Sequence, residues 1–184
     1  MRKWIIPLIV LGVLVLGGVW LIIVNNELQR LEEDIESQWS VVHKIHQERT
    51  NLIPTLLTAA SEYAEFEEET LENILSAHRE AQQPPMGETQ IAHRELGQFA
   101  RVHSQLSTSL LDLQYVFNRY PYLKKYPAFK LSVKELDSLN QSMQLERAKF
   151  NERVGLYNTE LSVFPKNVFA AILGYSEHDF FKPE

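Results

Sequence analysis

The sequence contains no cysteine among its 184 residues. This absence excludes disulfide bonds, thiol catalysis, thiolate metal sites and a lipid-modified cysteine at a cleavage site. An excess of positive charge is also lacking, because the formal net charge is −6. Without a basic surface to neutralise phosphates, nucleic acid is not an expected partner.

Motifs for catalysis are absent as well. The chain has no G-x-S-x-G, no H-E-x-x-H, no P-loop and no kinase signature. Six histidines are present, including the pair His43-x-x-His46, but the Glu-x-x-His motif of carboxylate-rich bundle sites does not occur. We interpret the histidines as solvated. We expect no enzyme activity, no catalytic or cofactor-binding residues, no cofactor and no metal site.

One long apolar run is present at residues 4–24, which read WIIPLIVLGVLVLGGVWLIIV. A helix of about 20 apolar residues crosses a hydrocarbon core of about 30 Å. The run is longer than the apolar region of a signal peptide, and no A-x-A-like cleavage site follows it. We predict an uncleaved single-pass transmembrane helix in the cell (inner) membrane, with residues 4–24 in contact with the bilayer.

Charged residues on the two sides of this run predict its orientation. Arg2 and Lys3 precede the run, whereas acidic residues dominate the segment after it. These acidic residues are Glu27, Glu32, Glu33, Asp34 and Glu36, against the single Arg30. The positive-inside rule then places the N-terminus in the cytoplasm and the rest of the chain on the outer, periplasmic side.

After residue 26 the apolar residues recur every three or four positions, which predicts an amphipathic helix that continues the membrane span. The first stripe is Leu28, Leu31, Ile35, Trp39, Val42 and Ile45. The same pattern continues to His78, but Pro54 interrupts it. Because proline removes a helix hydrogen bond and Asn51 is suited to cap a new helix, Arg49–Pro54 is either a turn between two helices or a kink in one.

Proline-containing breaks at residues 82–87 and 120–127 predict two further long helices, one between the breaks and one after the second. If the pattern after Pro54 is counted as the second stripe, the third stripe is Leu96, Phe99, His103, Leu106, Leu110, Leu113, Phe117 and Tyr120. The fourth is Phe129, Val133, Leu136, Asn140, Met143, Arg147, Phe150, Val154, Tyr157, Leu161 and Phe164. Pro165 ends that helix, and a short apolar turn at 168–173 precedes Gly174 as its C-terminal cap. Such spacing predicts an all-α, up-and-down bundle with coiled-coil-like packing.

Four polar residues occupy stripe positions: Arg49, His103, Asn140 and Arg147. Buried polar groups must be paired, and in bundles they often fix the register of the helices. We predict that they form a structural polar layer. A ligand- or metal-binding site in the bundle core is the alternative, with His103, Asn140 and Arg147 as its residues.

Several motifs resemble the LemA family. They are Asn26-x-Leu28, Trp39-Ser40, Arg49-x-x-Leu52-Ile53-Pro54, Tyr120-Pro121-x-Leu123, Arg147-x-x-Phe150-Asn151, Tyr157-Asn158, Phe164-Pro165-x-Asn167, Gly174-Tyr175 and the closing Phe181. The resemblance implies a membrane-anchored antiparallel four-helix bundle, which favours a turn at Arg49–Pro54. It also implies a bacterial envelope protein of poorly defined molecular role, often described with the opposite orientation in the membrane.

We therefore expect three regions: a transmembrane anchor at residues 1–25, a helical bundle at 26–165, and a short C-terminal helix and tail at 166–184. The expected function is that of a membrane-tethered, non-enzymatic scaffold or adaptor that docks a membrane or envelope protein. The alternative function is a bundle that senses a ligand or metal in an envelope or stress-response process.

Overall fold

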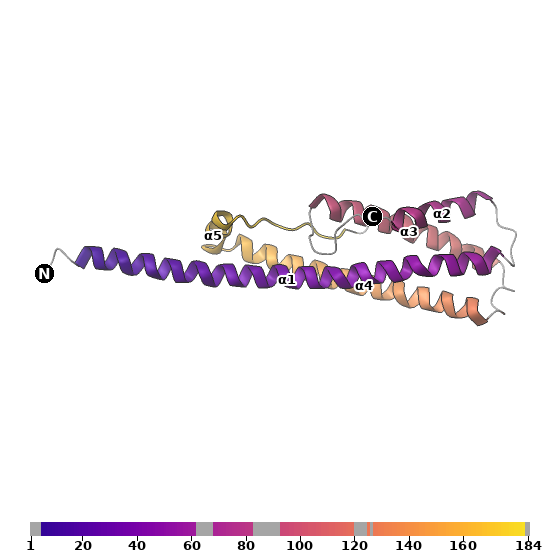
Figure 1. Cartoon of the computed structure of the whole chain (residues 1–184), viewed down its shortest axis with the longest axis horizontal. Helices are drawn as coiled ribbons and strands as arrows, with labels where there is room; N and C mark the ends of the chain where they lie inside the picture. The colour runs from indigo at the N-terminus through magenta and orange to yellow at the C-terminus, as the bar shows by residue number, and fades with distance from the viewer. Residues whose placement is uncertain (1–4, 62–67, 83–92, 120–124, 126, 183–184) are drawn as a thin grey trace. The chain divides into compact units, whose positions relative to one another are not determined.

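The computed structural model describes residues 5–61, 68–82, 93–119, 125 and 127–182. This part of the chain folds into five helices, and no strand occurs in it. The helices are α1 (Ile5–Ser61), α2 (Glu68–Gln82), α3 (His93–Arg119), α4 (Pro127–Ser162) and α5 (Lys166–Leu173) (Figure 1). The predicted all-α fold class is confirmed.

Helix α1 joins the apolar run and the first amphipathic stripe in one element of 57 residues. Among the described helices it is the one long and apolar enough to cross a membrane. Side chains of its apolar segment, such as Leu14 and Leu16, are exposed in the protein. The predicted continuity between the apolar segment and the following helix is confirmed.

The turn that the family resemblance favoured at Arg49–Pro54 is wrong, because α1 continues through Pro54 to Ser61. Pro54 itself is exposed, and its missing N–H removes one helix hydrogen bond. Its buried neighbours compensate, since Ile53, Leu56 and Leu57 all belong to the hydrophobic core. The next helix, α2, begins only at Glu68.

The chain divides into two compact units. Unit 1 comprises residues 1–35 and 152–178, and unit 2 comprises residues 36–151 and 179–184. Each unit therefore contains part of α1 and part of α4. The boundaries predicted at residues 25 and 165 stay predictions.

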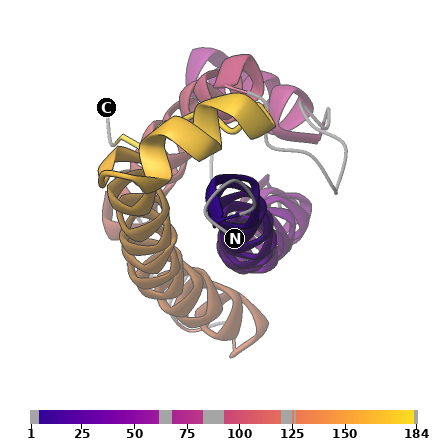
Figure 2. The same cartoon turned by 90° about the vertical axis from the view of Figure 1, so that its left-hand side faces the viewer.

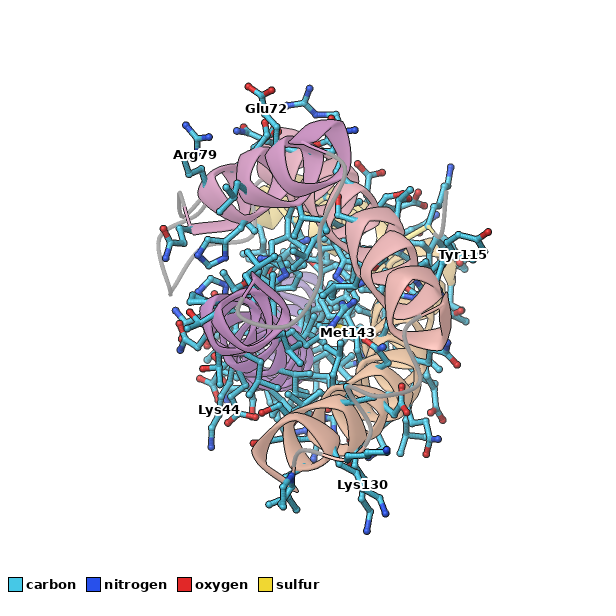
Figure 3. All side chains as sticks on the ribbon, turned by 90° about the vertical axis from the view of Figure 1, so that its right-hand side faces the viewer. Lys44, Glu72, Arg79, Tyr115, Lys130 and Met143 are labelled. Carbon is cyan, nitrogen blue, oxygen red and sulfur yellow. The ribbon has the colours of Figure 1, made fainter. Side chains whose placement is uncertain are left out.

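Unit 2 has a hydrophobic core to which four helices contribute. Its members are Ile53, Leu56 and Leu57 of α1, Ile74 and Ala81 of α2, Val102, Leu106 and Leu110 of α3, and Leu136 of α4. Within this unit α2 packs against α3. Figure 3 shows the side chain of Met143 directed into the interior, whereas Lys44, Glu72 and Lys130 point outward.

The predicted stripes describe the buried faces of the described helices well. Leu96, Phe99 and Leu106 of the third stripe are buried, as are Phe150 and Tyr157 of the fourth. Leu113, Phe117, Tyr120 and Phe129 lie outside the side chains that the structure describes. Phe164 was wrongly assigned to the fourth stripe, because α4 ends at Ser162 and the Phe164 side chain is 77% exposed.

The last helix of unit 1, α5, is capped by Gly174, as the sequence predicted. Gly174 caps α5 in the left-handed conformation with φ 85°, which a residue without a Cβ adopts at little cost. The Tyr175 N–H then donates to the Ala170 carbonyl at 3.0 Å. Pro165 lies immediately before α5, after a cis peptide bond with Phe164.

The continuity of α1 can be tested by Pro54→Ala. Proline inside a helix costs about 3 kcal/mol relative to alanine, so we expect the substitution to raise the free energy of unfolding by about 2 kcal/mol. The measurement is denaturant unfolding of the full chain in detergent, followed by circular dichroism. Thr55→Ala, at the exposed neighbouring position, serves as control and should add only a few tenths of a kcal/mol. A destabilised Pro54→Ala variant would contradict the continuous helix.

Candidate functional site

Arg49 of α1 is the centre of a polar cluster inside unit 2. Its side chain is only 3% exposed. One guanidinium nitrogen, Nη1, lies 3.2 Å from Nδ1 of His103, and Nη2 donates to Oγ of Ser107 at 3.1 Å. The Nε atom has no hydrogen-bond partner. The structure thus brings together Arg49 and His103, two residues that the sequence placed in one polar layer.

Among the described residues, no carboxylate neutralises the charge of Arg49. Burial lowers the pKa of Arg49 to about 10, so the side chain still carries its charge at neutral pH. Within the described part of the chain, no ion pair involves Arg49 or Arg147. A buried charge without a counter-charge costs several kcal/mol, which is why most such charges are paired.

His46, His78 and His103 are buried, so their interpretation as solvated is wrong. Burial lowers the pKa of His46 to about 4 and that of His103 to about 3, and the positive charge of Arg49 adds to both effects. Neutral His103 can accept the N–H of Arg49 at Nδ1 only if its own proton is on Nε2. The His103 ring therefore solvates the guanidinium without adding charge.

Asn140 and Arg147, the other two members of the predicted layer, lie on α4 and line a cavity with Arg49 and His103. The cavity has a volume of about 260 Å³. The Oδ1 atom of Asn140 is buried and has no partner, and the Arg147 guanidinium lies 5.3 Å from the ring centroid of Phe181. Other polar residues on its wall are Ser104, Ser107, Gln144 and Lys182.

Ser107 and Phe181 belong to this site although the polar pattern did not point to them. Ser107 follows His103 by four residues, a spacing that places two side chains on one face of a helix. That spacing was the available signal. Phe181 is buried against Phe99 and His103, with ring centroids 5.7 and 5.5 Å apart. No local pattern in the tail indicates this contact.

The C-terminal tail is attached to α4 by asparagine side chains. In unit 2, Oδ1 of Asn151 accepts the Phe181 N–H at 2.7 Å, and Nδ2 donates to the Phe181 carbonyl at 2.9 Å. In unit 1, Asn158 forms the same pair of hydrogen bonds with the backbone of His178, both at 2.9 Å. Both asparagines are family-motif positions, and each pairs with a backbone as a neighbouring strand would.

The remaining family-motif positions that the structure describes belong to the hydrophobic core or lie in or next to helices. Trp39 is buried beside Phe99 and Phe150, with ring centroids 4.7 and 5.6 Å away. Pro54, Pro165 and Gly174 lie in or next to the helices described above. Tyr120 and Pro121 lie outside the described residues.

The cluster is chemically suited to an anion rather than a metal cation. Among the described residues, no three histidine, aspartate or glutamate side chains converge as metal ligands. The cavity wall instead carries Arg49, Arg147 and Lys182 with serine and amide groups. These groups supply hydrogen-bond donors and positive charge, which a carboxylate or phosphate needs.

Comparison with known proteins identifies the family. A model of the LemA family matches residues 38–184. The chain therefore belongs to the LemA family. The match contains all four polar-layer positions and both tail asparagines, and it begins after the apolar segment of α1.

The LemA family is not known as an enzyme family, and the match itself names no molecular activity. A comparison with curated proteins gave no match. The function of this LemA-family chain must therefore be argued from its geometry.

The buried histidines predict a loss of stability in acid. The unfolded state binds protons below about pH 6.5, whereas folded His46 and His103 stay neutral down to about pH 4 and pH 3. Stability is therefore present above pH 6.5 and lost as the pH falls below it, by about 2 kcal/mol per histidine at pH 5. The measurement is the free energy of unfolding of the full chain between pH 7 and pH 5.

His103→Gln keeps an acceptor for Arg49, and we expect it to remove about half of this pH-dependent loss. His43→Gln, on α1 at a half-buried position, is the matched control and should retain the full loss. An unchanged pH dependence in His103→Gln would contradict a neutral buried His103.

Proposed function

We propose that this LemA-family protein is a membrane-tethered, non-enzymatic helical protein that binds a small oxyanion in the Arg49 cavity. The observation that carries this proposal is a buried, charged Arg49 that has no ion-pair partner among the described residues and faces a cavity. A carboxylate or phosphate group is the ligand class that this wall would recognise. The protein would act as a sensor whose stability depends on its ligand.

The energetics favour a ligand over a purely structural layer. In a structural layer the buried polar groups pair with one another, but Nε of Arg49, a hydrogen-bond donor, has no partner among the described residues. An oxyanion can accept from such a donor. Proteins retain such destabilising groups mainly where function requires them. An oxyanion in the cavity would offset the charges of Arg49 and Arg147 and accept hydrogen bonds from their guanidinium groups.

The size of the cavity limits the ligand. At about 260 Å³ it lies just below the range of about 300–1,000 Å³ typical of sites for drug-sized molecules. Phe181 and Lys182 of the tail form part of its wall. The site is thus suited to a small anion that would contact the tail as well as α1, α3 and α4.

The membrane tether is supported by the exposed apolar segment of α1. We place this segment in the inner membrane, with the N-terminus cytoplasmic and the helices on the outer side, because Arg2 and Lys3 precede it and acidic residues follow it. We also propose that the helices of unit 2 form an antiparallel four-helix bundle, since all four contribute to one core.

A scaffold role is a second candidate, favoured by exposed apolar residues of unit 2. Leu111 and Tyr115 of α3 are one helical turn apart, and their side chains are 63% and 69% exposed. Figure 3 shows Tyr115 on a different side of the unit from Lys44. Exposed apolar neighbours of this kind are suited to docking a partner protein.

Anion binding is tested by Arg49→Met and Arg147→Met in the full chain in detergent. We expect inorganic phosphate or acetate to raise the melting temperature of the wild type above that in chloride at equal ionic strength, because ligand binding stabilises the native state. Both variants should lose this rise. Without anion, Arg49→Met should be as stable as the wild type or more stable, because a buried unpaired charge is removed.

Arg101→Met is the matched control for this experiment, since Arg101 is an exposed arginine of α3 that pairs with Glu80. It should respond to phosphate as the wild type does. A wild type indifferent to both anions, together with an Arg49→Met variant that melts several degrees lower, would favour the structural polar layer and contradict the proposal.

The scaffold candidate and the orientation are tested together by a photo-crosslinking residue at position 115 in intact cells. We expect reproducible partners from the outer side of the inner membrane, because Tyr115 is exposed. The same residue placed at position 44, also exposed, is the control and should give different adducts. No reproducible partner at 115 would count against docking there, and cytoplasmic partners would reverse the orientation.

A further inference from the structure

Helix α5 carries an apolar stripe that unit 1 does not cover. Phe164 precedes the helix, and Val168 and Ile172 follow at intervals of four residues, which places the helical members on one face. Phe164 is 77% exposed and Ile172 is 70% exposed. On the other side of α5, Ala170 is buried and Phe169 is half-buried. A continuous exposed apolar stripe indicates an interaction surface.

Three contacts attach α5 to α1 at the end of the apolar segment. The ring of Phe169 lies 4.8 Å from that of Trp20, edge to face. Tyr175 Oη donates to Oδ1 of Asn25 at 3.0 Å, and Lys166 Nζ donates to Oε2 of Glu27 at 2.9 Å. These contacts place α5 beside the part of α1 where apolar residues give way to charged ones. In a spanning helix that region lies at the membrane–water interface.

The direction of α5 agrees with such a position. In Figure 2 the N-terminal part of α1 is viewed along its axis, and α5 lies across the view. If α1 crosses the bilayer, a helix that lies across it runs along the membrane surface. Amphipathic helices in this orientation bury their apolar face about 5–10 Å into the boundary between headgroups and acyl chains.

We propose that α5 is an interfacial helix whose stripe of Phe164, Val168 and Ile172 inserts into the surface of the bilayer that α1 crosses. This inference rests on the membrane tether proposed above. Lipid is the occupant because α1 exposes its own apolar side chains, Ile22 and Ile23, next to the contacts that hold α5.

The charges around α5 indicate that its binding depends little on the charge of the lipid headgroups. Lys166 is the basic residue of α5, and it is already paired with Glu27 and Glu160. It therefore contributes little attraction to anionic headgroups. Insertion depends on the apolar stripe, so α5 should enter zwitterionic phosphatidylcholine as well as bilayers that contain phosphatidylglycerol.

The absence of native cysteine makes the experiment direct, because single-cysteine variants of the full chain can carry one spin label each. The test positions are Val168→Cys and Ile172→Cys, which are exposed and remove no core packing. Val13→Cys reports the membrane span, and Glu33→Cys, exposed on α1 beyond the apolar segment, reports water. The measurement is label accessibility to oxygen and to a soluble nickel complex in phosphatidylcholine nanodiscs.

We expect the oxygen-to-nickel accessibility ratios at 168 and 172 to be well above that at 33 and below that at 13, because an interfacial helix lies less deep than the middle of the span. Ratios at 168 and 172 equal to that at 33, with a high ratio at 13, would overturn the interfacial helix and leave the tether standing. A low ratio at 13 would overturn both. Dipolar broadening at 172 combined with a low ratio would show a second protein copy on the stripe and would also overturn the inference.

Discussion

The positive charge of Arg49 determines how the interior of unit 2 is built. Arg49 lies in an apolar stripe, so its neighbours must supply polar atoms to solvate the charge and must not add further positive charge. His103 and Ser107 provide polar atoms at 3.2 and 3.1 Å, and His46 and His103 stay neutral at physiological pH. What the described residues do not supply is a negative charge beside Arg49. This deficit, together with the cavity next to it, gives the site its affinity for an oxyanion in our proposal.

The C-terminal tail makes this site dependent on the end of the chain. Asn151 holds the backbone of Phe181 with two hydrogen bonds, and the Phe181 ring then packs on Phe99 and lies under Arg147. Each hydrogen bond contributes only about 1 kcal/mol net, but burial of an aromatic ring contributes more. The aromatic residue therefore supplies most of the attachment, and the asparagine sets its register. A ligand in the cavity would contact a wall that the tail completes.

Unit 1 is organised around the apolar segment of α1. Trp20 and Asn25 both contact the α5 region, and Tyr157 of α4 donates to Glu32 at 3.0 Å. Polar contacts thus begin where the apolar run ends, as expected if that run is in lipid. The exposed stripe of α5 would be covered in the same way as the apolar run, because lipid would solvate it without protein contacts. Phe164, which periodicity alone assigned to a buried face, is left exposed because α4 has already ended.

The sequence alone determined the helices, their buried stripes, the apolar segment and the Gly174 cap, because these depend on local periodicity and backbone preference. It also placed Arg49, His103, Asn140 and Arg147 on buried faces. Only the tertiary structure decided that α1 passes through Pro54, that His46 and His103 are buried and neutral, and that Phe181 completes the cavity. Those outcomes depend on contacts between residues distant in the chain, such as His103 with Phe181, and no local pattern encodes such contacts.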